Sequence, residues 1–250
     1  MKFALYGGKK VEAEATLKGA LCPVCDAEVI AKCGDKNIHH WAHKSNKECP
    51  HWWENETQWH RDWKNHFPLE WQEIVQKSET GEKHVADVKT SNDLVVEFQH
   101  SPIKPEEILA RNTFYENIVW VVDGKRRKTD KKKFEEVLNP KSWAYGYWDN
   151  SILLSDWSNI QKPVFFDFGK PLLWAISDGW IIDFEKDDFI EGVKMGGKTL
   201  TILLKEKVKN LSVKERQKEK HIADLRRRQQ GRAWFGINNP VTKRYRRRKF

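Results

Sequence analysis

The stretch that most constrains the fold is residues 84–103, "HVADVKTSNDLVVEFQHSPI". Two apolar runs flank the polar letters "TSND", which predicts two antiparallel strands joined by a short turn. Because strand side chains alternate between faces, Val95, Glu97 and Gln99 share one face of the second strand. Asp87 lies on the first strand, where the hairpin brings it towards Glu97. A sheet favours valine at such positions, so these polar residues need a chemical explanation.

Two carboxylates that are held close together repel each other and favour a cation or a proton between them. Hard divalent cations such as Mg²⁺ take oxygen ligands of this kind. The pair therefore predicts a site for Mg²⁺ or Mn²⁺ at Asp87 and Glu97. An edge hairpin whose polar residues simply face water is the plainer interpretation, and it stays open.

The patterns on either side of the hairpin predict an α/β core in the order helix, three strands, helix, strand. Pro105 suits the first turn of the second helix, and Asp-Gly ends the last strand. The predicted helices cover residues 54–67 and 104–117, and the predicted strands cover residues 70–76, 83–89, 93–99 and 118–124.

The D-x9-E-x-Q spacing within this order resembles the signature of the PD-(D/E)xK, or restriction-endonuclease-like, nucleases. The resemblance implies that Asp87 and Glu97 bind the metal and that an acidic residue on the first helix completes the site. Glu56 is the candidate, with Glu54 as the alternative. The sequence departs from the signature at Gln99, where these nucleases carry a lysine that polarises the attacking water. An amide lacks that charge but can still orient a water molecule.

Three further side chains are candidates for contacting phosphate. Glu56, His60 and Lys64 recur every four residues and so share one face of the predicted helix. His60 and Lys64 suit phosphate binding or proton transfer, and Arg111 suits bidentate phosphate binding. An ion ladder on a solvent-facing helix and a surface salt bridge at Arg111 are the alternatives.

A Cys/His cluster near the start, "CPVCDAEVIAKCGDKNIHHWAHK", predicts a structural zinc ribbon. Two thiolates of a CxxC turn can reach one ion, and an HxxH pair adds two imidazoles. The first candidate set is Cys22, Cys25, His40 and His43. Cys33, His39 and Cys49 are open as replacements, and a set of reduced, buried thiols without metal is the alternative.

The segments "CPVC", "HWAH", "ENETQWHRDWK", "VVEFQHSPI" and "IVWVVDG" together resemble the competence protein CoiA-like family. In that family a short Cys/His part precedes a PD-(D/E)xK nuclease-like domain. The resemblance covers about residues 20–125, implies DNA processing, and is in keeping with Gln99, because the family shows "EFQ" at this place.

Basic charge is concentrated at the end of the chain. Residues 201–250 hold 17 basic and four acidic side chains, although the whole chain has a net charge of only +9. Clustered Lys and Arg gain by releasing counterions from nucleic acid, whereas a solvated charged helix is the alternative. The candidate contacts are Arg226, Arg227, Arg228, Arg246, Arg247 and Arg248.

We expect four segments in the 250 residues. These are a zinc-ribbon-like module (1–50), a restriction-endonuclease-like core with a mixed sheet (51–125), a Trp-rich β extension (126–204) and a basic helical tail (205–250). Within the extension we expect strands at residues 142–149, 163–169, 171–177, 179–184 and 198–205. No apolar run approaches the roughly 18 residues that cross a bilayer, and the start lacks a secretory signal. A cytoplasmic protein with reduced cysteines is therefore expected.

These features predict a Mg²⁺- or Mn²⁺-dependent nuclease with a structural zinc ion, acting on DNA and not at a membrane. Two alternatives are open: a DNA-binding accessory protein that keeps the nuclease fold without cleavage, and a structural or host-interaction protein. Homodimerisation is also open.

Overall fold

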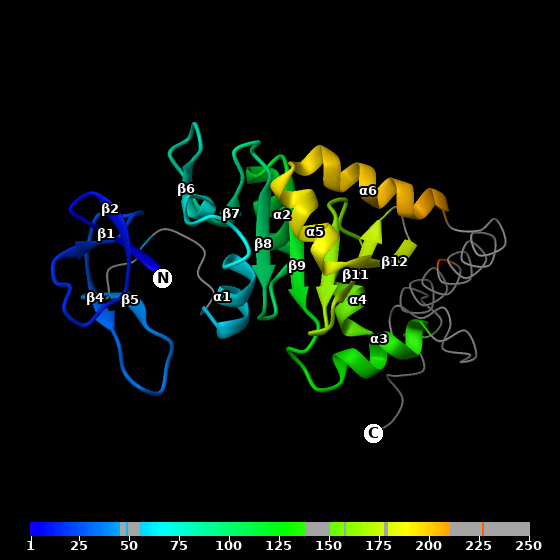
Figure 1. Cartoon of the computed structure of the whole chain (residues 1–250), viewed down its shortest axis with the longest axis horizontal. Helices are drawn as coiled ribbons and strands as arrows, with labels where there is room; N and C mark the ends of the chain where they lie inside the picture. The colour runs from blue at the N-terminus through cyan, green and yellow to red at the C-terminus, as the bar shows by residue number, and fades with distance from the viewer. Residues whose placement is uncertain are drawn as a thin grey trace, which may run out of the picture.

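The computed structural model contains two β-sheets (Figure 1) and describes residues 1–45, 49, 56–138, 151–157, 159–177, 180–210 and 227. The first sheet is built from residues 3–43, and the second from residues 72–185. Some predicted features lie outside the described residues: the strand at 142–149, Glu54, Arg226, Arg228 and Arg246–Arg248.

The N-terminal sheet is antiparallel and has the strand order β2-β1-β3-β4-β5. Its strands are β1 (Phe3–Tyr6), β2 (Lys9–Glu12), β3 (Ala20–Leu21), β4 (Glu28–Lys32) and β5 (His40–His43). A small core that includes Ala4, Cys22, Val29 and Trp41 holds it together. Val75 and Val85 of the second sheet pack against this core, so the two sheets are in contact.

The second sheet is mixed and has the strand order β12-β11-β10-β9-β8-β7-β6. Its strands are β6 (Gln72–Lys77), β7 (Lys83–Lys89), β8 (Val95–Gln99), β9 (Ile118–Asp123), β10 (Val164–Asp167), β11 (Leu172–Ser177) and β12 (Trp180–Glu185). Strands β8, β9 and β10 are parallel, whereas the other pairs are antiparallel. Strands from beyond residue 125 therefore extend the same sheet as the hairpin.

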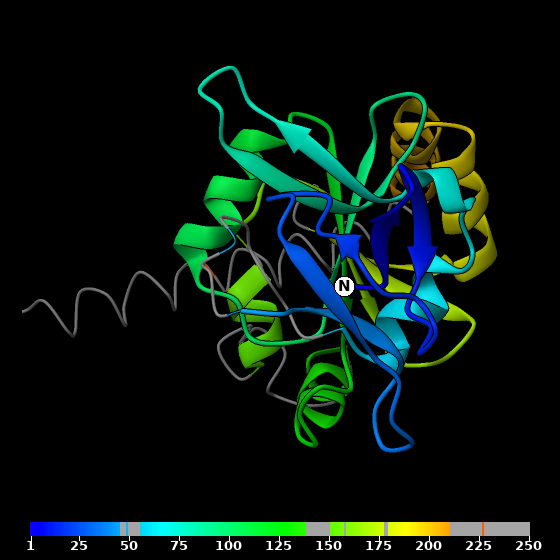
Figure 2. The same ribbon diagram turned by 90° about the vertical axis from the view of Figure 1, so that its left-hand side faces the viewer.

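Helices cover both faces of the second sheet and make three layers (Figure 2). The helices are α1 (Gln58–Lys64), η1 (Leu69–Trp71), α2 (Pro105–Phe114), α3 (Asp130–Leu138), α4 (Ile152–Trp157), α5 (Lys186–Lys194) and α6 (Gly197–Asn210). Side chains of α1, α5 and α6 share one core with Val96 and Phe98. Side chains of α2, α3 and α4 share the other with Val95 and Trp120, as strand alternation requires.

The region around the hairpin has the predicted order of helix, three strands, helix and strand. The first helix is shorter than predicted and begins at Gln58, because Thr57 caps it by accepting a hydrogen bond from the amide of His60. Glu56 therefore precedes the helix instead of lying on its face.

One predicted strand, residues 198–205 ("KTLTILLK"), is wrong: these residues belong to α6. The β-branched letters favour a strand, but Leu200 and Leu204 are one helical turn apart and both are buried in the core under the sheet. Packing of that stripe outweighs the local preference for a strand.

Candidate functional site

Three acidic residues occupy one row across neighbouring strands of the second sheet. The pairs Gln72↔Val88 and Ile74↔Ala86 place Glu73 of β6 opposite Asp87 of β7. The pair Val88↔Val96 places Asp87 opposite Glu97 of β8. Side chains at directly opposite positions interact across strands, so three negative charges in a row require compensation.

Glu97 is buried and is compensated from α2. Arg111 donates from Nη1 to Glu97 Oε2 at 2.7 Å and from Nη2 to Glu107 at 2.6 Å. The other oxygen, Glu97 Oε1, is buried without a hydrogen-bond partner. Burial raises the pKa of Glu97 to about 8, and Asp87 adds to the rise although Arg111 opposes it.

Asp87 is held between the two helices. The amide of Phe98 donates to Asp87 Oδ2 at 3.0 Å, whereas Oδ1 lies 3.8 Å from Lys64 Nζ, too far for a hydrogen bond. Burial raises the pKa of Asp87 although Lys64 and His60 oppose the rise. The carboxylate thus has one anchored oxygen and one oxygen without a close donor among these contacts.

Lys64 is the cation at the other end of the row. Its ammonium is buried and lies 2.6 Å from Glu56 Oε1 and 2.8 Å from Glu73 Oε1. Burial alone would lower its pKa, but the carboxylates of Glu73, Asp87 and Glu56 raise the pKa above its ordinary value. Lys64 therefore stays charged, and it holds Glu56 and Glu73 beside the hairpin.

Glu73 is a site residue that the sequence pattern does not predict. Besides Lys64, its carboxylate accepts hydrogen bonds from the backbone amides of Lys2 and Phe3, which belong to the N-terminal part of the chain. Despite burial, Lys64, the N-terminal ammonium and the Phe3 amide lower the pKa of Glu73 to about 2. Its φ of +47° is an uncommon conformation for a non-glycine residue, so the strand is distorted where the two sheets meet.

The side chains predicted to bind phosphate, those of His60, Lys64 and Arg111, are buried and do not face solvent. His60 is buried, and its Nδ1 accepts from the amide of Thr57 at 3.1 Å, which completes a capping box. Lys64 and Arg111 are buried in the ion pairs described above. The solvent-facing ladder at His60 and Lys64 and the surface salt bridge at Arg111 are therefore ruled out, and phosphate binding stays a prediction.

Gln99 ends β8 and is buried beside the row. Its amide nitrogen Nε2 donates to the carbonyl of Ser101 at 2.8 Å. The next residue, His100, was not singled out in the sequence. Its Nδ1 lies 2.8 Å from Asp123 Oδ2 at the end of the neighbouring strand, a long-range contact that no local pattern in the sequence reveals.

The donor set at Asp87 and Glu97 fits a hard divalent cation. Each residue offers a carboxylate oxygen without a hydrogen bond in the contacts above, and such oxygens are the ligands that Mg²⁺ prefers. The carboxylate of Glu56 contacts Lys64 and Arg61, and its part in a metal site stays a prediction. A cation here would also replace the proton favoured at Glu97.

A second group of side chains is a Cys₃His cluster in the N-terminal part. The ligand atoms of Cys22, Cys25, His43 and Cys49 lie within 4.8 Å of one another. The sulfurs of Cys22 and Cys49 are 3.8 Å apart, and Cys25 Sγ lies 3.3 Å from His43 Nε2. A tetrahedral zinc ion with bonds of about 2.3 Å to sulfur separates two sulfurs by about 3.8 Å, so the cluster suits a structural zinc.

The thiols carry opposite pKa shifts without a metal. Burial raises the pKa of Cys22 and of Cys49. Although burial acts in the same direction at Cys25, hydrogen bonds with the Ala27 backbone and with Cys49 lower its pKa. Zinc binding must therefore release protons from the cluster.

The fourth ligand position is filled by Cys49, one of the open alternatives, in place of the first candidate His40. His40 and His43 are three positions apart on β5, and residues an odd number apart point to opposite faces of a strand. His40 Nδ1 instead lies 2.9 Å from the carbonyl of Ile38. The HxxH spacing suits a helix or a loop, but not this strand.

The structure thus defines a mixed α/β protein with a Cys₃His cluster on an antiparallel sheet and a carboxylate pair on adjacent strands of a mixed sheet. Residues 7–51 match the family described as "Competence protein CoiA, N-terminal domain". Residues 57–151 match the family described as "Competence protein CoiA, nuclease-like domain". The two matches cover more than half of the chain, and the protein belongs to the competence protein CoiA family.

No curated protein and no solved structure matches the chain. Within the described residues, no helix has the length and apolar character needed to cross a membrane. Of the six arginines predicted to bind nucleic acid at the end of the chain, Arg227 alone is described, and it is helical and exposed.

The Cys₃His cluster predicts which substitutions release zinc. We expect about one zinc ion per purified chain, because four suitable ligands converge. Cys49→Ala should remove most of the bound metal, whereas His40→Ala should retain it, as measured by elemental analysis after exhaustive dialysis. Loss of zinc in His40→Ala together with full retention in Cys49→Ala would contradict this ligand set.

The lowered pKa of Glu73 predicts that the stability of the fold depends on pH. Its pKa is lowered in the folded state, from 4.5 to about 2, so its ionised form stabilises the fold at a pH above about 4.5. That contribution, on the order of 3 kcal/mol, is lost as the pH falls through about 2. Urea unfolding should show the wild type exceeding Glu73→Gln in free energy at pH 6, with a gap that narrows steadily towards pH 3.

Glu70 supplies the control for this experiment, because it is an exposed glutamate in the preceding 3₁₀ turn. Glu70→Gln should change the free energy of unfolding by less than about 0.5 kcal/mol. A gap for Glu73→Gln that does not vary between pH 6 and pH 3 would disprove the charged role of Glu73.

Proposed function

We propose that this protein is a metal-dependent nuclease that hydrolyses phosphodiester bonds in DNA, in a competence or related DNA-processing context. The observation that carries the proposal is the row of Asp87 and Glu97 on adjacent strands, inside the region that matches a nuclease-like domain. The order of helix, three strands, helix and strand supports a restriction-endonuclease-like core.

In this proposal Asp87 and Glu97 hold the Mg²⁺ or Mn²⁺ ion. A bound divalent ion stabilises charge on the phosphoryl oxygens and lowers the pKa of a bound water. The amide of Phe98 fixes Asp87, and Arg111 fixes Glu97, so both carboxylates are oriented before the metal arrives. Preorganised ligands lower the reorganisation that binding requires.

Gln99 and Lys64 together replace the lysine of the related nuclease signature: Gln99 orients the water, and Lys64 supplies the positive charge. The Ser101 carbonyl orients the Gln99 amide, whose oxygen can accept a hydrogen bond from the attacking water. Lys64 supplies the positive charge from α1, at 3.8 Å from Asp87 Oδ1. Glu56 acts through Lys64, which it holds at 2.6 Å.

Zinc at the Cys₃His cluster has a structural role in this proposal. Four protein ligands leave no open coordination position for a substrate. The sheet that carries the cluster contacts the second sheet through Glu73, so zinc stabilises the part of the chain that anchors Glu73 and Lys64.

Cleavage assays test the nuclease directly. Purified protein is incubated with linear, circular and single-stranded DNA in Mg²⁺, Mn²⁺ or EDTA. We expect cleavage that requires the divalent ion and falls at least about 100-fold in Asp87→Asn and Glu97→Gln, because each removes a charged ligand.

Asp93→Asn is the matched control, since Asp93 is an exposed aspartate in the turn of the same hairpin. Asparagine tolerates its positive φ of 59°, so activity should stay within about twofold of wild type. Metal-independent cleavage, or equal cleavage by Asp87→Asn, would refute the nuclease. Binding of DNA without any cleavage would instead assign the protein to the accessory role.

A further inference from the structure

The three parallel strands of the second sheet end at one edge, and basic residues follow each of them. Strands β8, β9 and β10 end at Gln99, Asp123 and Asp167, and their registers align these ends. Exposed lysines come after each strand, and we refer to them as the basic edge: Lys104 after β8; Lys125, Lys128, Lys131, Lys132 and Lys133 after β9; and Lys170 after β10.

Most acidic side chains near the basic edge are already paired. Asp130 and Asp156 both contact Arg126 and Arg127, which are less exposed than the lysines. Glu135 and Glu136 contact Lys131 and Lys133 through surface ion pairs at 3.9 and 3.2 Å, which are weak in water. The exposed charge at this edge is therefore mainly positive.

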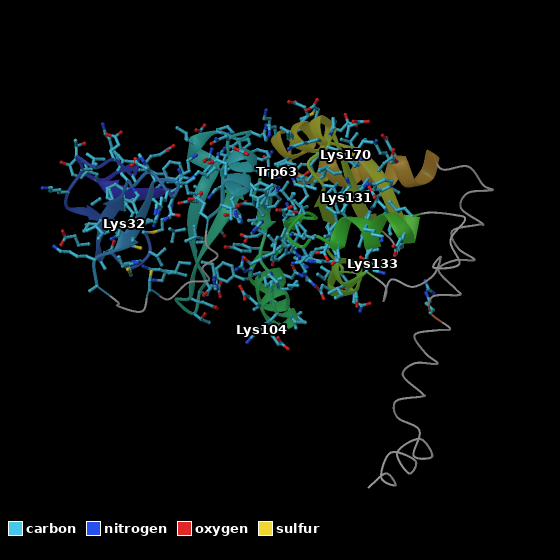
Figure 3. All side chains as sticks on the ribbon, turned by 90° about the horizontal axis from the view of Figure 1, so that it is seen from below. Lys32, Trp63, Lys104, Lys131, Lys133 and Lys170 are labelled. Carbon is cyan, nitrogen blue, oxygen red and sulfur yellow. The ribbon has the colours of Figure 1, made fainter. Side chains whose placement is uncertain are left out.

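The edge is a fixed part of the fold rather than a loose loop. Lys125 lies over Gly169, where an added Cβ would be 2.5 Å from its Nζ. The amide of Lys125 donates to Asp123 at 2.8 Å, and Phe134 and Val137 of α3 are buried under the sheet. Figure 3 views the protein from below and labels Lys104, Lys131, Lys133 and Lys170.

The basic edge is joined to the carboxylate site through one carbonyl group. Ser101 O accepts from Gln99 Nε2 at 2.8 Å and from Arg126 Nη1 at 3.3 Å. Gln99 belongs to the candidate site, and Arg126 belongs to the segment that carries five of the lysines. This carbonyl therefore connects the candidate site to the segment that carries those lysines.

We propose that the basic edge binds the phosphate backbone of the nucleic acid on one side of the cleaved bond. The proposal rests on the function proposed above and adds where the substrate lies. Exposed lysines of one sign, spaced along an edge, suit a polyanion and release its counterions. Because ammonium groups contact phosphate and not base edges, binding here is independent of base sequence.

Fluorescence anisotropy with a labelled DNA duplex in EDTA separates binding from cleavage. The variant Lys128→Glu/Lys132→Glu changes two exposed lysines of the basic edge. We expect its Kd to rise at least about tenfold at moderate salt, and the slope of log K against log salt to fall in magnitude by about 1 to 2. A second duplex of unrelated sequence should give the same Kd.

The control variant Lys194→Glu/Lys198→Glu makes the same change of charge at the opposite edge. Lys194 and Lys198 are exposed and flank Gly196, which lies against Asn92 in the turn between β7 and β8. This variant should keep the Kd within about threefold of wild type, because long-range charge effects are screened by salt.

The possible results separate this inference from the proposed nuclease. An unchanged Kd and salt slope in Lys128→Glu/Lys132→Glu, or an equal loss of affinity in the control variant, overturns the proposal that the basic edge binds DNA. In that case metal-dependent cleavage still supports the nuclease. Selective loss of binding in a protein that never cleaves supports the edge and refutes the nuclease. A wild type that binds no DNA overturns both.

Discussion

The ammonium of Lys64 is the interaction on which the rest of the site depends. It is buried, and it brings Glu56, Glu73 and Asp87 to one place from a loop and two strands. Three carboxylates this close to one another repel, and removal of one partner from a buried ion pair costs several kcal/mol. Lys64 therefore fixes the position of α1 relative to the hairpin. Arg111 of α2 fixes the carboxylate of Glu97 through its hydrogen bond.

Through Glu73, this interaction also links the two parts of the chain. The amides of Lys2 and Phe3 donate to the same carboxylate that Lys64 contacts, and Lys2 Nζ reaches Asn65 and Gln72. The N-terminal part of the chain, which carries the Cys₃His cluster, thus contacts the candidate site through Glu73. Zinc at the cluster and a divalent ion at Asp87 and Glu97 would have separate chemical roles. The contacts of Glu73 would connect the parts of the chain that hold them.

The predictable features were local, and the rest depended on long-range register. Alternation along "DLVVEFQ" was enough to find Glu97 and Gln99, because period-two patterns need only neighbouring residues. No local pattern predicts Glu73, because its role requires the pairing of β6 with β7 and contact with residues about 70 positions away. The HxxH spacing favours His40 over Cys49, because spacing alone does not reveal that HWAH is a strand. The β-branched letters of residues 198–205 favour a strand and hide the helical stripe of α6.

The most direct test of the account is to locate the divalent ion in crystals grown with Mn²⁺, using anomalous diffraction. We predict a single strong peak at the sheet, within about 2.5 Å of Asp87 Oδ1 and Glu97 Oε1, with Arg111 still bound to Glu97 Oε2. No peak at this position in saturating Mn²⁺, or a peak whose ligands exclude both Asp87 and Glu97, would contradict the assignment of these carboxylates to the metal.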